Sequence, residues 1–317
     1  MTPVSTSASN AKLTIHLPNT NKALSDALKQ ASPEQLVQLK EGKDIKSVLT
    51  SLFHAKIDNS KSDAILLDLL KNSAVFKNMG NFTEDLKSLV ATLKSDPILA
   101  QKLLKIEEFL EPASTLKTHN LKEKIDNSGI FMESKIGSLP ENYDFNEALH
   151  DDLKAKLLSL GEEIKESHPH DEKLQNQIDQ LTTQIDYHQL LSHLNNSTSL
   201  YLPFTWDQLE KGSLSLKKGK ENKFYCEINL TLKEYGEMDL MMGLYDEDQL
   251  EMQIQTGKKE LKTLLQEHLG ELRAVLIEAG ITPRSIRIYD TNEIIIPKTN
   301  AYISDDTNYS PNFEERV

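Results

Sequence analysis

The apolar residues of this chain change their spacing near Ser199, from the helical period to strict alternation. The clearest alternation lies in residues 230–240, where it stops at Gly236 and then resumes through Met238 and Leu240. Alternation places every second side chain on one face of a strand, so this stretch predicts two paired strands with one buried face. A change of period of this kind predicts an α+β protein, with a helical region followed by a small antiparallel sheet.

A helix is expected to cover that sheet. A third alternating run at 250–254 is followed by residues 258–279, whose apolar side chains recur at helical spacing along one stripe. The pattern therefore predicts one long helix, with Leu272 and Leu276 buried against the sheet. Residues 286–288 then predict a last short strand.

The chain before Ser199 is expected to be helical. Thr83-Glu84-Asp85 resembles a helix start, and apolar residues follow at helical spacing as far as Leu93. Two longer helices are expected at 143–166 and 171–194, joined by a turn that contains Pro169. The predicted division is a disordered start at 1–12, a helical domain at 13–118, a helical connecting region at 119–198, an α/β domain at 199–291 and a flexible acidic tail at 292–317.

Charge is unevenly distributed along the 317 residues, whose net charge is −13. Residues 1–140 hold 18 lysines and 16 acidic residues, whereas residues 141–317 hold 18 basic and 33 acidic residues. Nucleic-acid binding needs a basic face, so the acidic half argues against a nucleic-acid partner and permits a basic protein partner. The sequence contains no run of about 18 apolar residues, so no membrane span is predicted.

Neither of two candidate chemical sites has the surroundings that its chemistry needs. The run from His168 to Glu172 offers metal-ligand types, but a short proline turn does not make them converge, so it predicts a surface loop. Cys226, the single cysteine, alternates onto the apolar face of its strand and predicts a small core residue rather than a nucleophile. We therefore expect no enzyme activity, no catalytic residues, no metal and no cofactor.

The α/β region resembles the C-terminal domain of the flagellar hook-length control family. The family signature runs Leu-x-Leu-x-Pro-x-x-Leu-Gly, followed by alternating apolar residues and later by a long helix that carries Leu-Arg and ends in Gly. Here Leu232 precedes Tyr235-Gly236, and Met238 and Leu240 alternate afterwards, while Leu272-Arg273 and Gly280 occupy the helix positions. The usual proline is missing, and Tyr235 stands in place of leucine.

The resemblance implies a binding function in flagellar assembly. It implies that the domain switches the specificity of export by contacting the cytoplasmic domain of the flagellar export-gate switch protein, with hook or hook-cap subunits as further partners. The matching positions are the candidate partner-binding residues: Leu232, Tyr235, Gly236, Met238 and Leu240. The expected location is the cytoplasm. Residues 1–12 would carry a type III export signal, through which the protein could also be secreted by the flagellar type III export apparatus.

Two further observations bear on this resemblance. Residues 127–135, Asn-Ser-Gly-Ile-Phe-Met-Glu-Ser-Lys, are similar to a segment found before the C-terminal domain in several hook-length-control-like proteins. The long Pro- or Gln-rich stretch of the typical family member is missing, because the 11 prolines are scattered. The alternative is therefore a cytoplasmic helical adaptor, or a regulator of flagellar assembly that is not secreted.

Overall fold

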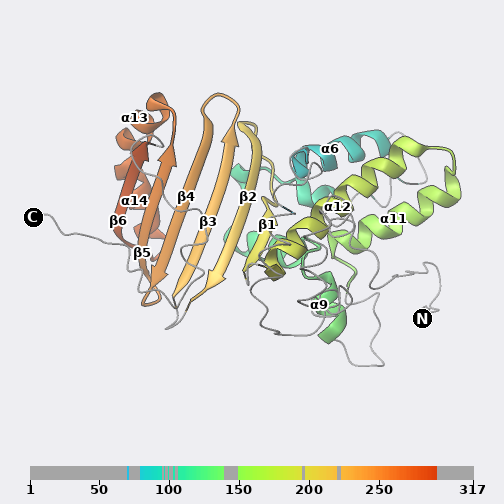
Figure 1. The fold of residues 1–317 in the computed structure, drawn as a ribbon, viewed down its shortest axis with the longest axis horizontal. Coiled ribbons are helices and arrows are strands. Elements are labelled where there is room, and N and C mark those ends of the chain that lie inside the picture. The colour runs from blue at the N-terminus through green and yellow to red at the C-terminus, as the bar shows by residue number, and fades with distance from the viewer. Residues whose placement is uncertain are drawn as a thin grey trace, which may run out of the picture. The chain divides into compact units, whose positions relative to one another are not determined.

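The computed structural model describes two separate stretches of compact structure, the helical unit within residues 1–207 and the sheet unit within residues 208–317 (Figure 1). The described residues are 79–94, 106–138, 149–194, 197–219 and 223–290, with Leu70, Asp96, Leu99 and Leu103 as single positions. The expected disordered start at 1–12, the helices expected before residue 79 and the tail 292–317 lie outside these residues.

Helix α6 (Phe82–Leu93) confirms the helix expected after Thr83, but it starts one residue earlier. The side chain of Asn81 accepts hydrogen bonds from the backbone N–H groups of Thr83 (3.0 Å) and Glu84 (3.4 Å), so Asn81 is the N-cap. The apolar stripe of α6 is buried, as its helical spacing predicts.

The rest of the helical unit is built around the long helix α12 (Glu172–Leu194), which matches the expected helix 171–194. It packs against α11 (Leu153–Ser167), α6 and the short strand β1 (Thr198–Tyr201) (Figure 1). Helix α11 starts later than the expected residue 143, because Asp152 caps it through the N–H groups of Lys154 and Ala155. The remaining elements are η1 (Glu108–Leu110), η2 (Ala113–Thr115), α8 (Thr118–Asp126) and α9 (Met132–Ser138).

The sheet unit confirms the expected strands, and with the helical unit it confirms the α+β class. Its strands follow one another in chain order across the sheet: β2 (Leu209–Lys218), β3 (Phe224–Leu232), β4 (Gly236–Tyr245), β5 (Gln249–Thr256) and β6 (Thr282–Asp290). Strands β2 to β5 are antiparallel, whereas β6 runs parallel to β5. The expected purely antiparallel sheet is therefore wrong at its last strand, because helices between β5 and β6 return the chain to the same end of the sheet.

The expected single helix 258–279 is two helices, α13 (Lys259–Glu267) and α14 (Leu269–Glu278), separated where His268 leaves helical torsion angles. Gly270 follows closely and weakens the helix at this point. The expected burial of Leu272 and Leu276 is also wrong, since both are only half-buried. Helix α14 packs on β6, and β6 is the last strand in the sheet order, so the outer side of α14 has little to pack against.

The turn between β4 and β5 is strained. Asp246 (φ 49°) and Glu247 (φ 73°) both adopt left-handed backbone angles, which asparagine and glycine suit best. We expect the double change Asp246→Asn with Glu247→Gly to raise the free energy of unfolding by about 1 kcal/mol, because it removes this strain. Thermal unfolding followed by circular dichroism measures the change.

A matched control for this prediction lies in the other hairpin. Lys233 is an exposed loop residue without a positive φ, so Lys233→Gly should lower stability, by about 0.5–1 kcal/mol. A stability gain from both changes would contradict the assignment of strain to the β4–β5 turn.

Candidate partner-binding surface

One face of the sheet is apolar from β2 to β6. Strand register brings apolar side chains into rows across the sheet, because directly paired residues share a face. One row is Leu216, Cys226, Met242, Met252 and Ile286, and the next is Leu214, Ile228, Leu240, Ile254 and Ile288. The opposite face carries mainly polar residues, although Met241 of β4 is buried there. The alternation predicted at 230–240, 250–254 and 286–288 is present in the structure.

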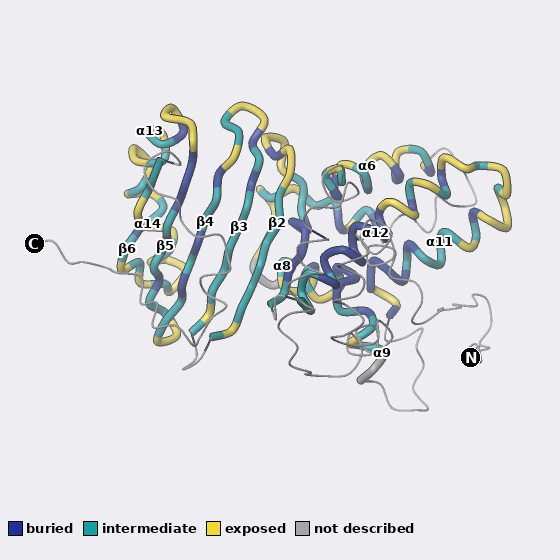
Figure 2. The backbone as a smooth tube through the Cα atoms, in the orientation of Figure 1, coloured by how far each residue is buried: buried dark blue, intermediate teal, exposed yellow. Residues whose placement is uncertain are grey.

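The helices cover only part of this apolar face. Helix α13 packs on β5 and β6, and α14 packs on β6 (Figure 1). Accordingly Met252, Ile254 and Ile286 are buried, with 5%, 2% and 8% of their surface exposed. Figure 2 shows the change from mostly buried positions on β5 to mostly intermediate positions on β3.

The remaining part of the face, on β2, β3 and β4, is apolar but incompletely covered. Its residues are half-buried except Phe224, which is 47% exposed. We call it the open half-face, and it consists of Leu214, Leu216, Phe224, Cys226, Ile228, Leu240, Met242 and Leu244. A contiguous apolar surface on a soluble domain is typical of a binding site.

The five candidate residues from the sequence lie together on the β3–β4 hairpin. Leu232 and Met238 are buried beside the hairpin turn, and Leu240 belongs to the open half-face. Gly236 has a φ of +71° and no atom within 4 Å of an added Cβ, so glycine is required by its backbone conformation and not by lack of space. Tyr235 is half-buried in the turn, next to the exposed Lys233 and Glu234.

Cys226 lies in the middle of the open half-face. Its place on the apolar face is as predicted, but the residue is half-buried and not fully in the core. Burial, followed by the negative charge of Glu227, raises the pKa of the thiol to about 12. The thiol is therefore protonated at neutral pH and unsuited to nucleophilic chemistry.

Lysines and aromatic rings meet at the end of the sheet where β3 begins. The ammonium group of Lys218 lies 5.7 Å from the centre of the Phe224 ring, and that of Lys223 lies 6.0 Å from the Tyr245 ring. The acidic turn at Asp246 and Glu247 lies at the same end of the sheet but beyond β4. The corner formed by β2 and β3 is consequently the basic one.

The segment 127–135 has a structural role in the helical unit. Glu133 and Asp186 both pair with the buried Lys154, and the Lys154–Asp186 distance is 2.7 Å. Gln189 accepts a hydrogen bond from Lys154 (2.7 Å) and donates to the backbone oxygens of Gly129 and Ile130 (both 3.1 Å). The segment is thus joined to both α11 and α12.

Charge pairing also fixes the protonation of this network. Burial alone would lower the pKa of Lys154, but Asp186 and Glu133 outweigh it and raise the pKa, which keeps the ammonium charged. Lys135 pairs with the fully buried Asp152 at 3.2 Å. No local sequence pattern indicates the partners of the segment 127–135, because they lie on helices more than 15 residues away.

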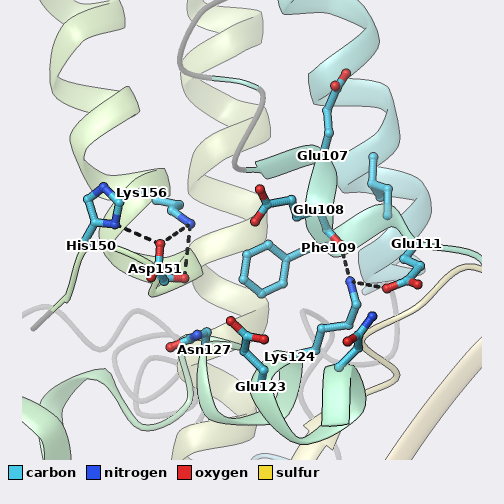
Figure 3. Close-up of a pocket in the computed structure, with 12 residues that line it drawn as sticks. Glu107, Glu108, Phe109, Glu111, Glu123, Lys124, Asn127, His150, Asp151 and Lys156 are labelled. Atoms are coloured by element: carbon cyan, nitrogen blue, oxygen red, sulfur yellow. Dashed lines mark hydrogen bonds and ion pairs between the residues drawn. The ribbon is translucent and has the colours of Figure 1, made fainter. Parts of the chain in front are cut away.

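The helical unit also contains a pocket of about 710 Å³ between η1, α8 and the start of α11 (Figure 3). Phe109 lies between the two lysines of the pocket, whose ammonium groups are 5.8 Å (Lys124) and 5.5 Å (Lys156) from its ring centre. Lys124 pairs with Glu111 (3.4 Å) and Lys156 with Asp151 (3.8 Å). The pocket is lined by more carboxylates than lysines, and it contains no nucleophile paired with a base.

The histidine run expected to be a surface loop is a turn between α11 and α12. His168 pairs with Asp96 at 3.1 Å, and Asp171 accepts a hydrogen bond from the N–H of Leu174 (3.0 Å) at the start of α12. Within the described ranges no three His, Cys, Asp or Glu side chains could together hold a metal ion. Of the helices that the structure describes, none is long and apolar enough to cross a membrane.

Comparison with known proteins bears on the sheet unit. The family model of the flagellar hook-length control protein FliK matches residues 213–293. No curated protein and no solved structure matched the chain. The match begins within β2, extends past β6 and includes all five candidate residues. Residues 213–293 are thus similar to the flagellar hook-length control family, which confirms the resemblance seen in the sequence.

Proposed function

We propose that this protein acts in the control of flagellar hook length, through protein binding by its sheet unit. The observation that carries the proposal is the match of residues 213–293 to the family model of a flagellar hook-length control protein. An open apolar half-face on the matched domain supports a binding role, since such a surface is stabilised when a partner covers it.

The proposed partner is the flagellar export apparatus, through the cytoplasmic domain of its export-gate switch protein. Leu232 and Met238 would hold the β3–β4 hairpin in shape from within, because both are buried. Tyr235 and Leu240, which are half-buried, would contact the partner. Binding would change export from rod and hook subunits to filament subunits.

Gene deletion tests the proposed function. We expect the deletion strain to make overlong hooks with few filaments, measured by electron microscopy of isolated hooks. The wild-type gene should restore hook length, whereas the variant Leu240→Gln should restore it poorly because it places an amide on the open half-face. Normal hooks in the deletion strain would rule out the proposed function.

The matched control is Glu237→Gln. Glu237 lies on the same strand as Leu240 but on the opposite, polar face, and it is exposed. This variant should restore hook length fully. Thermal unfolding of both purified variants separates a lost contact from a lost fold, and equal failure of two folded variants would contradict the assignment to the open half-face.

The alternative is a regulator of flagellar assembly that is not secreted. It is favoured by the scattered prolines, since the chain lacks the extended Pro- or Gln-rich spacer of the typical family member. The deletion strain that carries the wild-type gene distinguishes the secreted protein from the regulator that is not secreted. Export-dependent appearance of the protein in the medium supports secretion, and its retention in cells with normal hook length supports the regulator.

A further inference from the structure

Two apolar side chains of α13 and α14 lie beside the packed face of their helices and remain exposed. Leu264 (40% exposed) comes three residues after the buried Leu261, and Val275 (62% exposed) three residues after Leu272. Three residues turn a helix by 300°, so each side chain is displaced by 60° toward the same side of the face that packs on the sheet. Ile277, which is 63% exposed, follows Leu272 by five residues and lies on the other side.

The topology turns the side of Leu264 and Val275 toward the open half-face. The parallel strands β5 and β6 are joined through α13 and α14, which pack on them (Figure 1). A connection between neighbouring parallel strands is right-handed. In that geometry the helix side that precedes the packed face is directed toward the earlier strands, here β4, and the opposite side is directed past β6. Leu264 and Val275 therefore border the open half-face, whereas Ile277 lies on the outer side.

This border is acidic. Four glutamates lie three or four residues from Leu264 or Val275, the spacing that places side chains on one side of a helix. All four are exposed, and they are Glu260, Glu267, Glu271 and Glu278. We call these glutamates, together with Leu264 and Val275, the acidic wall.

An apolar floor beside an acidic wall fits a partner element with one apolar side and one basic side. We propose that the open half-face and the acidic wall bind one basic amphipathic helix of a partner protein. The inference rests on the proposed binding role of the sheet unit and names the kind of element that the unit binds. The glutamates attract the basic side, and the apolar side removes the floor from water.

The dimensions of the open half-face suit a single helix. Its three strands, β2, β3 and β4, are together about 14 Å wide, and a helix with its side chains has a diameter of about 10–12 Å. Its three rows of apolar side chains lie about 6.7 Å apart along the strands, and a helix advances about 6 Å in four residues. Successive apolar positions of the helix therefore meet successive rows.

A second copy of the chain fits this surface less well. The three rows span about 20 Å along the strands, so two open half-faces packed together would bury about 560 Å² in all, well below the roughly 1,200 Å² of a stable interface. The acidic walls of the two copies would also repel each other. Charge thus favours a basic partner over self-association.

A synthetic peptide tests the proposal directly. The probe is a fluorescein-labelled peptide of about 16 residues, with leucines at i, i+3, i+4 and i+7 spacing and lysines elsewhere. Titration with the full-length protein, followed by fluorescence anisotropy, should show saturable binding. A peptide of the same composition, reordered so that its leucines lie all around the helix, should not bind, and neither should the ordered peptide with glutamates in place of the lysines.

Two equally exposed residues of α14 provide a matched pair of variants. Val275→Ser should weaken binding of the ordered lysine peptide about fivefold, because the valine side chain is covered by the bound helix. Ile277→Ser should leave binding unchanged, because Ile277 lies on the outer side. Circular dichroism checks that both variants keep the fold of the sheet unit.

A pair of charge reversals tests the acidic wall. Glu267→Lys with Glu278→Lys should weaken binding about tenfold, and high salt should reduce the difference from the unmodified chain. Glu237→Lys with Glu251→Lys makes the same change in net charge on the opposite face of the sheet and should leave binding unchanged.

Four outcomes would overturn the proposal. They are equal binding of the ordered and reordered lysine peptides, equal effects of the Val275 and Ile277 changes, equal effects of the two charge reversals, and a dimer in analytical ultracentrifugation that Val275→Ser dissociates. The last would show that a second copy is the occupant. Because the readout is peptide binding to purified protein, its failure leaves the hook-length test of the deletion strain untouched.

Discussion

Replacing Lys154 with methionine is expected to lower the free energy of unfolding of the helical unit by about 3–5 kcal/mol. Methionine retains an unbranched apolar stem but leaves two carboxylates, Glu133 and Asp186, without the charge that compensates them. Asp186 is 3% exposed, so water cannot replace the lost partner. The quantity to measure is the urea dependence of Trp206 fluorescence, since Trp206 is the only tryptophan and belongs to the helical unit.

Two controls isolate the buried charge. Lys87 pairs with Glu84 at 3.8 Å on the exposed side of α6, and Lys87→Met should cost less than about 1 kcal/mol. Neutralising the whole group, with Glu133→Gln, Lys154→Met and Asp186→Asn together, should cost less than Lys154→Met alone, because no unpaired charge remains. An equal cost for the Lys154 and Lys87 changes would show that the network contributes nothing specific.

The second large effect is expected from Gly129→Ala, which should lower the free energy of unfolding of the helical unit by about 2–4 kcal/mol. Two causes add to give this loss. Gly129 has a φ of +88°, at which a Cβ costs about 1–2 kcal/mol. The added Cβ would also lie 2.7 Å from Cβ and 2.9 Å from the backbone nitrogen of Lys154, so α11 itself would have to move. The same fluorescence measurement in urea gives the cost.

Other glycines of the chain separate these two causes. Gly280 has a similar φ of +81° but open space around it, so Gly280→Ala should show only the backbone cost, measured by circular dichroism of the sheet unit. Gly161 lies inside α11 and its added Cβ would be 3.4 Å from Ile178, an ordinary contact. Gly161→Ala should therefore stabilise the helical unit by about 0.5–1 kcal/mol. A loss of stability at Gly161 as large as at Gly129 would contradict the steric argument.

The sequence predicted the strands of the sheet unit well, because alternation is a property of each strand by itself. The glycine turn at Gly236 was equally visible, since it interrupts the alternation. The parallel direction of β6 was not predictable from the sequence, because Ile286 and Ile288 alternate in the same way whether the strand runs parallel or antiparallel to β5. Only the connection through α13 and α14 fixes that direction.

The candidate surface was predictable in part. The sequence identified the β3–β4 hairpin with Leu232 and Leu240, but it could not show where the helices end their cover of the apolar face. That limit depends on the break at His268 and on the position of α14 over β6. The buried partners of Glu133 were not predictable either, because Lys154 and Asp186 are 21 and 53 positions away, beyond the range of any local pattern.

The pairing of the strands also sets an order of folding events. In the sheet unit each strand from β2 to β5 pairs with the next one along the chain, so little chain entropy is lost before the first contacts form. The helical unit instead joins Asp85 to Gln184 (2.6 Å) and Ser128 to Tyr201 (2.8 Å), contacts that close loops of 99 and 73 residues. The part of the chain that is synthesised first must therefore wait for α12 and β1, and the later meander is the faster of the two to fold.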